Sequence, residues 1–331
     1  MMAGTFQAFR VEAHGEAGRG RIADMTLDEL SAGDVLVRTL YAGVNYKDAL
    51  AGTGQGRIVR RYPSVGGIEA VGVVEEVSDN PSVAEGTTVI LHGYGLGVER
   101  DGGFSPWVRV TADMVTPLPE GLEPLAAAGI GVAGHTIAVA LDLLELNGLK
   151  PENGPVAVTG ATGGTGSLAV SMLAAQGYDV VAVSRKSAAE RYLKSIGAKA
   201  VIPPPEETSA RPLESARWAG AIDATGGRIL EWLIRTMKPN GVVAAFGNAA
   251  GLELNTTVLP FILRGVRLIG VNADTRPPYR GAVWQRLATD LNPRFMDDML
   301  RVVRLEELPA VMESMVAGTT QGRTLVQFNR D

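Results

Sequence analysis

The sequence predicts an α/β protein in two parts, a run of short strands followed by a doubly wound parallel sheet. Up to about residue 123, short apolar runs separated by glycine and proline are typical of a partly open β-barrel. From about residue 125, short apolar strands alternate with helix-forming segments, which indicates a parallel sheet covered by helices. A strand, a glycine-rich turn and a helix at 155–177 form the element around which the second part is organised.

The expected elements follow from the apolar runs and their periods. In the first part we expect strands at 5–12, 34–41, 87–92 and 104–110, a strand pair at 66–77, and a short helix within 42–54. In the second part we expect six strands, at 155–159, 179–184, 199–202, 220–224, 241–246 and 266–271. Beyond residue 274 we expect helices near 280–291 and 306–317 and a last strand at 323–328.

Composition narrows the class of protein. The length of 331 residues and the apolar content of 46% allow more than one hydrophobic core. The formal net charge of −5 argues against nucleic acid as the main partner. The absence of cysteine excludes disulfides and thiol nucleophiles, and with no secretory signal pattern it favours a cytoplasmic protein. The apolar run at 125–141 is short for a membrane span and contains His135, so we expect a buried helix and no membrane partner.

Residues 155–166, PVAVTGATGGTG, are the strongest functional motif. A strand that leads into small residues and a helix N-terminus suits the pyrophosphate of a dinucleotide. A tight turn without a ligand is the alternative, and Ser167, in place of lysine, excludes a phosphate-loop NTPase. Two registers fit the fingerprint: Ala161, Gly163 and Gly166, or Gly164, Gly166 and Ala169. GIGVAG at 129–134 has the same glycine spacing, but no strand precedes it, so we expect close packing on a buried helix.

The end of the next strand indicates which dinucleotide binds. A site specific for NAD usually has Asp or Glu there, about 20 residues beyond the glycines. Here the strand ends in Ser184, Arg185 and Lys186, and Asp179 lies at its opposite end. One hydroxyl and two cations suit a 2′-phosphate, so we expect NADPH; an ordinary solvated basic turn is the alternative.

The whole chain resembles the medium-chain dehydrogenase/reductase superfamily. Zinc-dependent alcohol dehydrogenases of that superfamily carry a Gly-His-Glu motif and a four-cysteine lobe. The motif here reads Gly67-Ile68-Glu69, and the spacings of His14, His92 and His135 suggest no shared site. The resemblance therefore implies a metal-free enzyme. It also implies a GroES-like catalytic domain at 1–125 and 274–331 and a Rossmann NADPH-binding domain at 126–273.

Four strings resemble the zinc-free acrylyl-CoA reductase group, whose members often bear the name of quinone oxidoreductases: NYKDAL (45–50), VTGATGG (158–164), PFILRGVRL (260–268) and QGRTLV (321–326). This resemblance implies hydride transfer from NADPH to the C=C bond of a short 2-enoyl-CoA, in a homodimer. The chain departs from the group at 131–137 and at 271–273, which border the cofactor cleft in relatives. Reduction of quinones, enals or enones is a second interpretation, and a non-catalytic, crystallin-like NADPH-binding protein is a third.

The candidate catalytic residues lie in NYKD. We expect Asn45 to donate a hydrogen bond at the nicotinamide or substrate, and Asp48 to hold Lys47 or the loop; a solvated cluster at a helix start is the alternative. Arg57, Arg60 and Arg61 could bind CoA phosphates or form a solvated basic face. The cofactor contacts expected from the motifs and the resemblance are Tyr46, Thr162, Gly163, Gly164, Thr165, Ser184, Arg185, Lys186, Asn248, Ala273 and Arg323.

Overall fold

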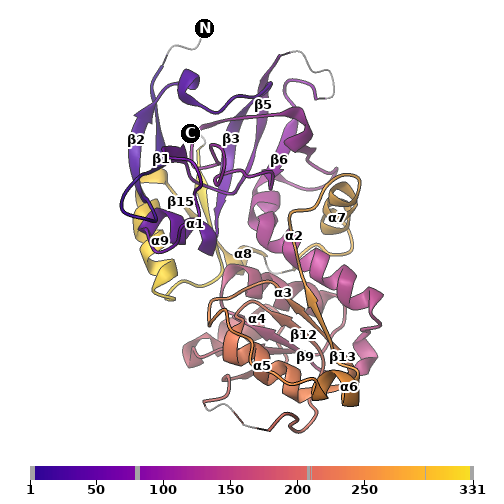
Figure 1. Ribbon diagram of the computed structural model, residues 1–331. Helices are drawn as coiled ribbons and strands as arrows, with labels where there is room; N and C mark the ends of the chain where they lie inside the picture. Colours follow the sequence, from indigo (N-terminus) through magenta and orange to yellow (C-terminus); the bar gives the residue numbers. More distant parts are fainter. Residues whose placement is uncertain (1–3, 79–82, 207–208, 210, 295, 329–331) are drawn as a thin grey trace. The chain divides into compact units, whose positions relative to one another are not determined.

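The computed structural model describes residues 4–78, 83–206, 209, 211–294 and 296–328 (Figure 1). The chain divides into two compact units. The first comprises the described residues of Met1–Val132, Asp274–Gly281 and Leu300–Asp331, and the second comprises those of Ala133–Ala273 and Ala282–Met299. The functional division expected from the sequence, at 125/126 and 273/274, stays a prediction, because a compact unit is not by itself a functional domain.

The first unit is built on two sheets. The larger sheet has the order β15-β16-β3-β5-β6-β8, with β7 also paired to β3. Its strands are β15 (Leu300–Val303), β16 (Arg323–Gln327), β3 (Val35–Val44), β5 (Glu69–Val77), β6 (Thr88–His92), β8 (Val115–Pro117) and β7 (Trp107–Val110). The smaller sheet has the order β2-β1-β4, with strands β2 (Arg19–Met25), β1 (Phe6–Glu12) and β4 (Ser64–Val65).

Helices α1 (Tyr46–Thr53) and α9 (Leu308–Val316) pack on each other in the core of this unit. A Cβ added at Gly52 would run into Met312 Sδ, so the absence of a side chain there lets the two helices approach closely. Phe9 and Phe104 meet edge to face with ring centroids 6.2 Å apart. This core fixes the start of α1, and therefore the NYKD residues.

The strand pair expected at 66–77 is wrong. The chain forms one strand there, β5, and the preceding β4 belongs to the other sheet, because β4 pairs with β1 whereas β5 pairs with β3 and β6. Gly67 has a φ of 97°, a conformation that only glycine adopts readily, and it turns the chain between the two sheets. The strands β2, β8 and β15 were not predicted.

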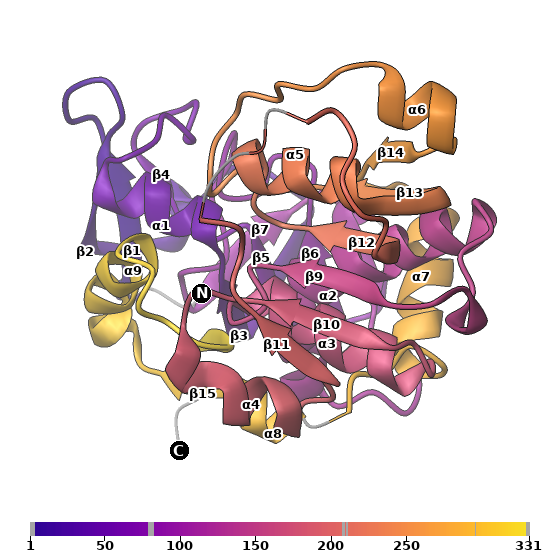
Figure 2. The same ribbon diagram turned by 90° about the horizontal axis from the view of Figure 1, so that it is seen from below.

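The second unit is a parallel sheet of six strands in the order β11-β10-β9-β12-β13-β14, which confirms the expected doubly wound fold. The strands are β11 (Ala200–Ile202), β10 (Val180–Val183), β9 (Val156–Thr159), β12 (Trp218–Asp223), β13 (Met237–Ala245) and β14 (Arg267–Gly270). Figure 2 shows α3 (Gly164–Ala175) and α4 (Glu190–Ser195) on one face and α5 (Gly227–Thr236) on the other. The direction of strand order reverses between β9 and β12, where dinucleotides bind in such sheets.

The second unit also contains α6 (Leu259–Arg264), α8 (Met296–Met299), most of α7 (Tyr279–Ala288) and the part of α2 (Pro124–Leu146) from Ala133 onward. Arg286 anchors α7 in this unit, because its guanidinium pairs with Asp142 and, at 2.7 Å, with Asp290. The ring of Trp284 lies against His135, with centroids 6.0 Å apart.

Helix α2 (Pro124–Leu146) is long and apolar enough to span a membrane, but 83% of its most apolar window is buried within the protein. It is a core helix, as the sequence predicts. It is not a regular one, since Gly131 leaves the helical conformation at φ 49° and ψ −156°. The close packing expected at 129–134 is present, since a Cβ added at Gly131 would collide with the Glu69 carboxylate, but the helix is broken at that residue.

Candidate cofactor and substrate site

The glycine-rich turn between β9 and α3 has the geometry of a pyrophosphate cradle. Gly160 has a φ of 59°, and the chain then turns back so that the Gly163 N–H donates to Gly160 O at 3.0 Å. Helix α3 begins at Gly164, and a Cβ added at Gly163 would make only an ordinary 3.4 Å contact with Gly160 O. The first N–H groups of a helix lack intrahelical acceptors, so the start of α3 suits a bound anion.

The structure favours the register Ala161, Gly163 and Gly166. A Cβ added at Gly166 would collide with Gly160 O and lie 2.7 Å from Ala161 Cα, so this residue has the close-packing role of the third glycine in the fingerprint. From the sequence alone, the register Gly164, Gly166 and Ala169 fitted the fingerprint equally well. Four residues expected to contact the cofactor lie in this turn or at the start of α3, namely Thr162, Gly163, Gly164 and Thr165.

A buried carboxylate beside this turn was missed by the sequence analysis. Asp223, at the end of β12, is fully buried, and its Oδ1 accepts from the hydroxyls of Thr159 at 2.6 Å and Thr225 at 2.8 Å. Its Oδ2 accepts the Gly226 N–H at 2.8 Å. These bonds fix the carboxyl ends of β9 and β12 relative to each other. An aspartate closing an otherwise apolar strand was the available signal.

The predicted cationic residues lie at the carboxyl end of β10. The Lys186 N–H donates to Ser184 Oγ at 3.0 Å, which closes the turn, and Arg185 is exposed. Partial burial lowers the pKa of the Lys186 ammonium, and the neighbouring Arg185 charge lowers it further. A bound anion would relieve this repulsion. Asn248, after β13, is exposed, and Ala273, after β14, is half-buried.

In the first unit, Asp48 binds the backbone of the NYKD loop. It does not bind Lys47, whose side chain is exposed. Asp48 is 4% exposed, and its Oδ2 accepts the Asn45 N–H at 2.9 Å while its Oδ1 accepts the Ile68 N–H at 3.0 Å. Burial raises the pKa of the Asp48 carboxyl to about 7; the Asn45 N–H opposes this, and the nearby Glu69 carboxylate adds to it. The carboxyl therefore ties the start of α1 to the start of β5. Tyr46 is 40% exposed.

The Asn45 side chain lies in a buried ionic network that the sequence did not predict. Its Nδ2 donates to Glu69 Oε1 at 2.8 Å and to Gly43 O at 3.4 Å, and its Oδ1 accepts from Arg323 Nη1 at 3.1 Å. Arg323 Nη2 pairs with Glu69 Oε1 at 2.6 Å, and both side chains are almost completely buried. Glu69 Oε2 also accepts the Val132 N–H, directly after the break in α2.

Arg323, expected to contact the cofactor, directs its guanidinium into the protein. Besides Glu69 and Asn45, it donates to three carbonyl oxygens, those of Gly129, Ala128 and Val44, at 3.0, 3.2 and 3.4 Å. A guanidinium has five N–H groups, and five acceptors are in place. A direct contact between Arg323 and a ligand would therefore require one of these bonds to break.

The three arginines expected to bind CoA are all exposed, and they are not equivalent. Arg60 pairs with Glu99 at 2.5 Å, while Arg57 and Arg61 form no ion pair with the described residues. Two of the three cations are therefore available to an anionic substrate.

No three His, Asp or Glu side chains lie close enough together to hold a metal ion, among the described residues. Glu69 of the Gly67-Ile68-Glu69 string is paired with Arg323. The metal-free reaction stays a prediction.

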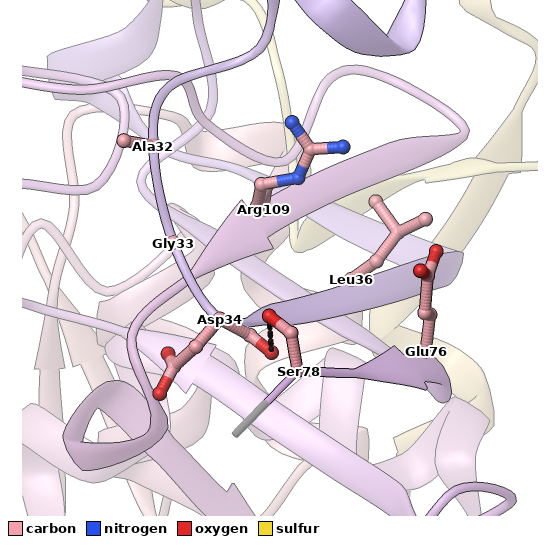
Figure 3. Close-up of a pocket in the computed structure, with 7 residues that line it drawn as sticks. All are labelled: Ala32, Gly33, Asp34, Leu36, Glu76, Ser78 and Arg109. Carbon is pink, nitrogen blue, oxygen red and sulfur yellow. Dashed lines mark hydrogen bonds between the residues drawn. The ribbon is translucent and has the colours of Figure 1, made fainter. Parts of the chain in front are cut away.

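A hollow of about 360 Å³ in the first unit has a different character (Figure 3). It is lined by Ala32, Gly33, Asp34, Leu36, Glu76, Ser78 and Arg109. Its polar groups join segments that are distant in the chain: Asp34 Oδ1 accepts the Ala112 N–H at 3.0 Å, and Arg109 Nη1 donates to Leu27 O at 3.1 Å. None of the predicted site residues lines it.

Two family models match the chain, and they fit its architecture. The alcohol dehydrogenase GroES-like domain matches residues 31–120, and the zinc-binding dehydrogenase model matches residues 164–289. With the parallel sheet and its glycine turn, these matches define the class as the medium-chain dehydrogenases/reductases.

Curated relatives and solved structures narrow the class. The chain is 44% identical to the probable acrylyl-CoA reductase AcuI of Escherichia coli, over 94% of this chain and 97% of that protein. It is 42% identical to Bacillus subtilis YhfP, which bears the name of a quinone oxidoreductase, over 99% of this chain and 100% of that protein. The crystal structure of Escherichia coli YhdH with bound NADPH matches with a TM-score of 0.94 at 41% identity, over 98% of this chain and 100% of that chain. The chain belongs to the acrylyl-CoA reductase and YhfP group of the medium-chain dehydrogenase/reductase superfamily, and it is an oxidoreductase.

Proposed function

We propose that the protein uses NADPH to reduce the C=C bond of a short 2-enoyl-CoA. The observation that carries this proposal is the 44% identity to a probable acrylyl-CoA reductase along almost the whole of both chains. The site supports it, because the glycine turn suits a pyrophosphate and NYKD offers an uncharged hydrogen-bond donor at Asn45. The non-catalytic alternative is set aside, since the family is one of enzymes.

The residues at the carboxyl edge of the parallel sheet fit a dinucleotide. The turn at 160–166 would hold the pyrophosphate, and Ser184, Arg185 and Lys186 would hold the 2′-phosphate of NADPH. A hydroxyl beside two adjacent cations at the end of β10 supports this assignment, because charge-assisted hydrogen bonds suit a dianionic phosphate. YhdH was crystallised with NADPH, whereas a structure of YhfP has NAD bound, so the preference has to be measured on this chain.

Bound NADPH would supply the hydride to the β-carbon of the alkene. The chain has to stabilise the negative charge that develops on the thioester oxygen, and a neutral donor does this without a proton transfer of its own. Asn45 is our candidate for that donor. The 2.8 Å hydrogen bond from Asn45 Nδ2 to Glu69 Oε1 holds the amide. The second Nδ2 hydrogen makes only a weak bond to Gly43 O, with 3.4 Å between nitrogen and oxygen, and can be donated to a ligand instead. Asp48 would fix the loop from which Asn45 acts.

The CoA moiety would interact with Arg57 and Arg61, and Arg60 would have to leave Glu99 to take part. That existing ion pair favours the second candidate function, reduction of a quinone, enal or enone, which needs no phosphate contacts. An NADPH-oxidation assay that compares acrylyl-CoA, crotonyl-CoA and a simple quinone decides between them. We expect turnover of the CoA esters with a KM that rises with salt; preference for the quinone, with no salt dependence, would contradict the proposal.

We also infer a cytoplasmic homodimer formed through β14. In the described part of the chain this strand pairs with β13 only, so one edge of the sheet is open. Beside it, α6 exposes Ile262 and Leu263, at 68% and 64%, and the preceding segment exposes Val258 at 65%. An open strand edge beside an apolar surface suits a second copy of the chain.

A further inference from the structure

We propose that the buried Glu69–Arg323 ion pair is a positioning device that fixes which way the Asn45 amide faces. The inference rests on the proposed function, since it concerns the same donor. Glu69 and Arg323 would touch neither substrate nor cofactor. They would act only through Asn45 and through the chain around it.

The two charged groups differ in whether they donate or accept hydrogen bonds, and this difference fixes the Asn45 amide. An ionised carboxylate only accepts hydrogen bonds, and a guanidinium only donates them. Glu69 Oε1 faces Asn45 Nδ2 at 2.8 Å, and Arg323 Nη1 faces Asn45 Oδ1 at 3.1 Å. Rotating the amide by 180° would set Oδ1 against the carboxylate and Nδ2 against the guanidinium, so both contacts would become repulsive. Only one of the two amide orientations is therefore compatible with the pair.

The pair itself is held by the two strands that carry it and by α2. Glu69 lies at the start of β5 and Arg323 at the start of β16, and both are buried, at 3% and 2% exposed. The Val132 N–H donates to Glu69 Oε2, and carbonyl oxygens of α2 accept from Arg323. These bonds leave the carboxylate and the guanidinium little freedom to follow a rotating amide.

Two glycines leave room for the pair. A Cβ added at Gly131, or at Gly43 on β3, would run into both the Glu69 carboxylate and Arg323 Nη2. Gly131 also breaks α2, which frees the Val132 N–H for Glu69. The break in this apolar helix and the orientation of the Asn45 amide therefore depend on the same carboxylate.

The orientation of the Asn45 amide decides whether it offers a hydrogen-bond donor or an acceptor to the ligand. With Oδ1 turned to Arg323, Asn45 presents Nδ2, and the hydrogen that Glu69 does not take is held only by the long 3.4 Å bond to Gly43 O, which a ligand oxygen would replace. With the amide reversed, Asn45 would present an acceptor to a developing negative charge. The ion pair therefore selects a donor over an acceptor at this position.

Three variants test this assignment. Glu69→Gln replaces an acceptor by a group that both donates and accepts, so only Arg323 still opposes reversal of the Asn45 amide. Glu69→Gln combined with Arg323→Met removes both charges and so leaves no lone buried charge. The matched control is Glu231→Gln, which lies on α5 of the second unit, is 5% exposed and is 3.8 Å from Arg235 in another buried ion pair.

We expect Glu69→Gln to lower kcat about tenfold or more, with the NADPH dissociation constant unchanged within about twofold, because the glycine turn at 160–166 and the cations at 185–186 are in the other unit. In the double variant, resistance to urea should recover relative to the single variant while kcat stays low. Glu231→Gln should lose stability without losing kcat. Recovery of kcat together with stability in the double variant would show a purely structural pair and overturn the proposal.

A second measurement does not depend on the substrate. In protein labelled with ¹⁵N-asparagine, the two Asn45 Nδ2 hydrogens should give distinct signals, with slow solvent exchange of the one bonded to Glu69, and Glu69→Gln should shift these signals and speed that exchange. Unchanged signals would overturn the proposal even if no tested substrate is turned over, whereas a wild-type enzyme inactive on the panel would count against the proposed function alone. If Glu69→Gln does not fold, Glu69→Asp keeps an acceptor-only group and should keep both the distinct signals and most of kcat; loss of the signals there would also overturn the proposal.

Discussion

The buried carboxyl of Asp48 predicts an unusual pH dependence of stability. Its pKa is raised to about 7 in the folded protein by burial, against an ordinary value of 3.8 in an exposed chain. The folded state therefore holds this proton over a pH range in which the unfolded state has released it. The stability that the group contributes is complete below pH 3.8 and is lost as the pH rises through 7.

The size of the effect follows from the shift. One pKa unit corresponds to about 1.4 kcal/mol, so a shift from 3.8 to about 7 corresponds to about 4 kcal/mol between the two ends of the range. As the pH rises from 5 to 8, we expect the titration of Asp48 to lower the free energy of unfolding by about 3 kcal/mol. The lowered pKa values of Asp274 and Asp290 act in the opposite direction, but their effect is confined to pH values near and below 4.

Urea denaturation from pH 5 to 8, on the wild type and on Asp48→Asn, isolates this contribution. Asparagine keeps the size of the side chain and one acceptor oxygen but cannot titrate. The difference in unfolding free energy between the two proteins should change by about 1.4 kcal/mol per pH unit below pH 7 and level off above it. A difference that stays flat across this range, or a ¹³C carboxyl titration of Asp48 near pH 4, would refute the reasoning.

Four further predictions address the cofactor, the donor, the metal and the assembly. Replacing Arg185 and Lys186 by alanine should raise the KM for NADPH at least tenfold and leave that for NADH nearly unchanged, because each charge-assisted contact contributes about 1.5–3 kcal/mol; equal use of both cofactors by the wild type would count against the assignment. Asn45→Ala should lower kcat about 10²-fold if the amide stabilises the transition state, whereas a raised KM at unchanged kcat would show a residue that only binds. Dialysis against a chelator should leave activity intact, and activity lost with one zinc per chain would contradict a metal-free enzyme. Ile262→Lys should shift the protein to a monomer in analytical ultracentrifugation, and an unchanged mass would show that this face is not the interface.

The parallel sheet could be predicted from the sequence because its strands are buried on both faces. β9, β10 and β12 are fully buried and appear in the sequence as short, nearly continuous apolar runs. Strands β2 and β15 are partly exposed, and β2 mixes charged and small residues, so neither shows a clear period. The turn at 160–166 was also readable, since its chemistry is local.

The network around Asn45 could not be predicted, because its members are far apart in the chain. Arg323 and Glu69 are separated by 254 positions, and the contact between Glu69 and Val132 spans 63. NYKD identified the loop, but its partners come from β5, α2 and β16. The glycines at 129–134 could be read as close packing, but the sequence carries no sign that Gly131 faces a carboxylate.

The discontinuous make-up of the two units has a practical consequence for dissecting the protein. The chain passes from one unit to the other after residues 132, 273, 281 and 299. The second unit nevertheless lies within one stretch, 133–299, of which only 274–281 belongs to the first unit. The first unit is the harder one to isolate, because its larger sheet needs β15 and β16 from the end of the chain beside β3 from the beginning. A fragment of the first unit would thus require 132 and 300 to be joined by a linker, whereas a 133–299 fragment needs no new connection and carries Arg280 out of its buried contact with His92 O into solvent.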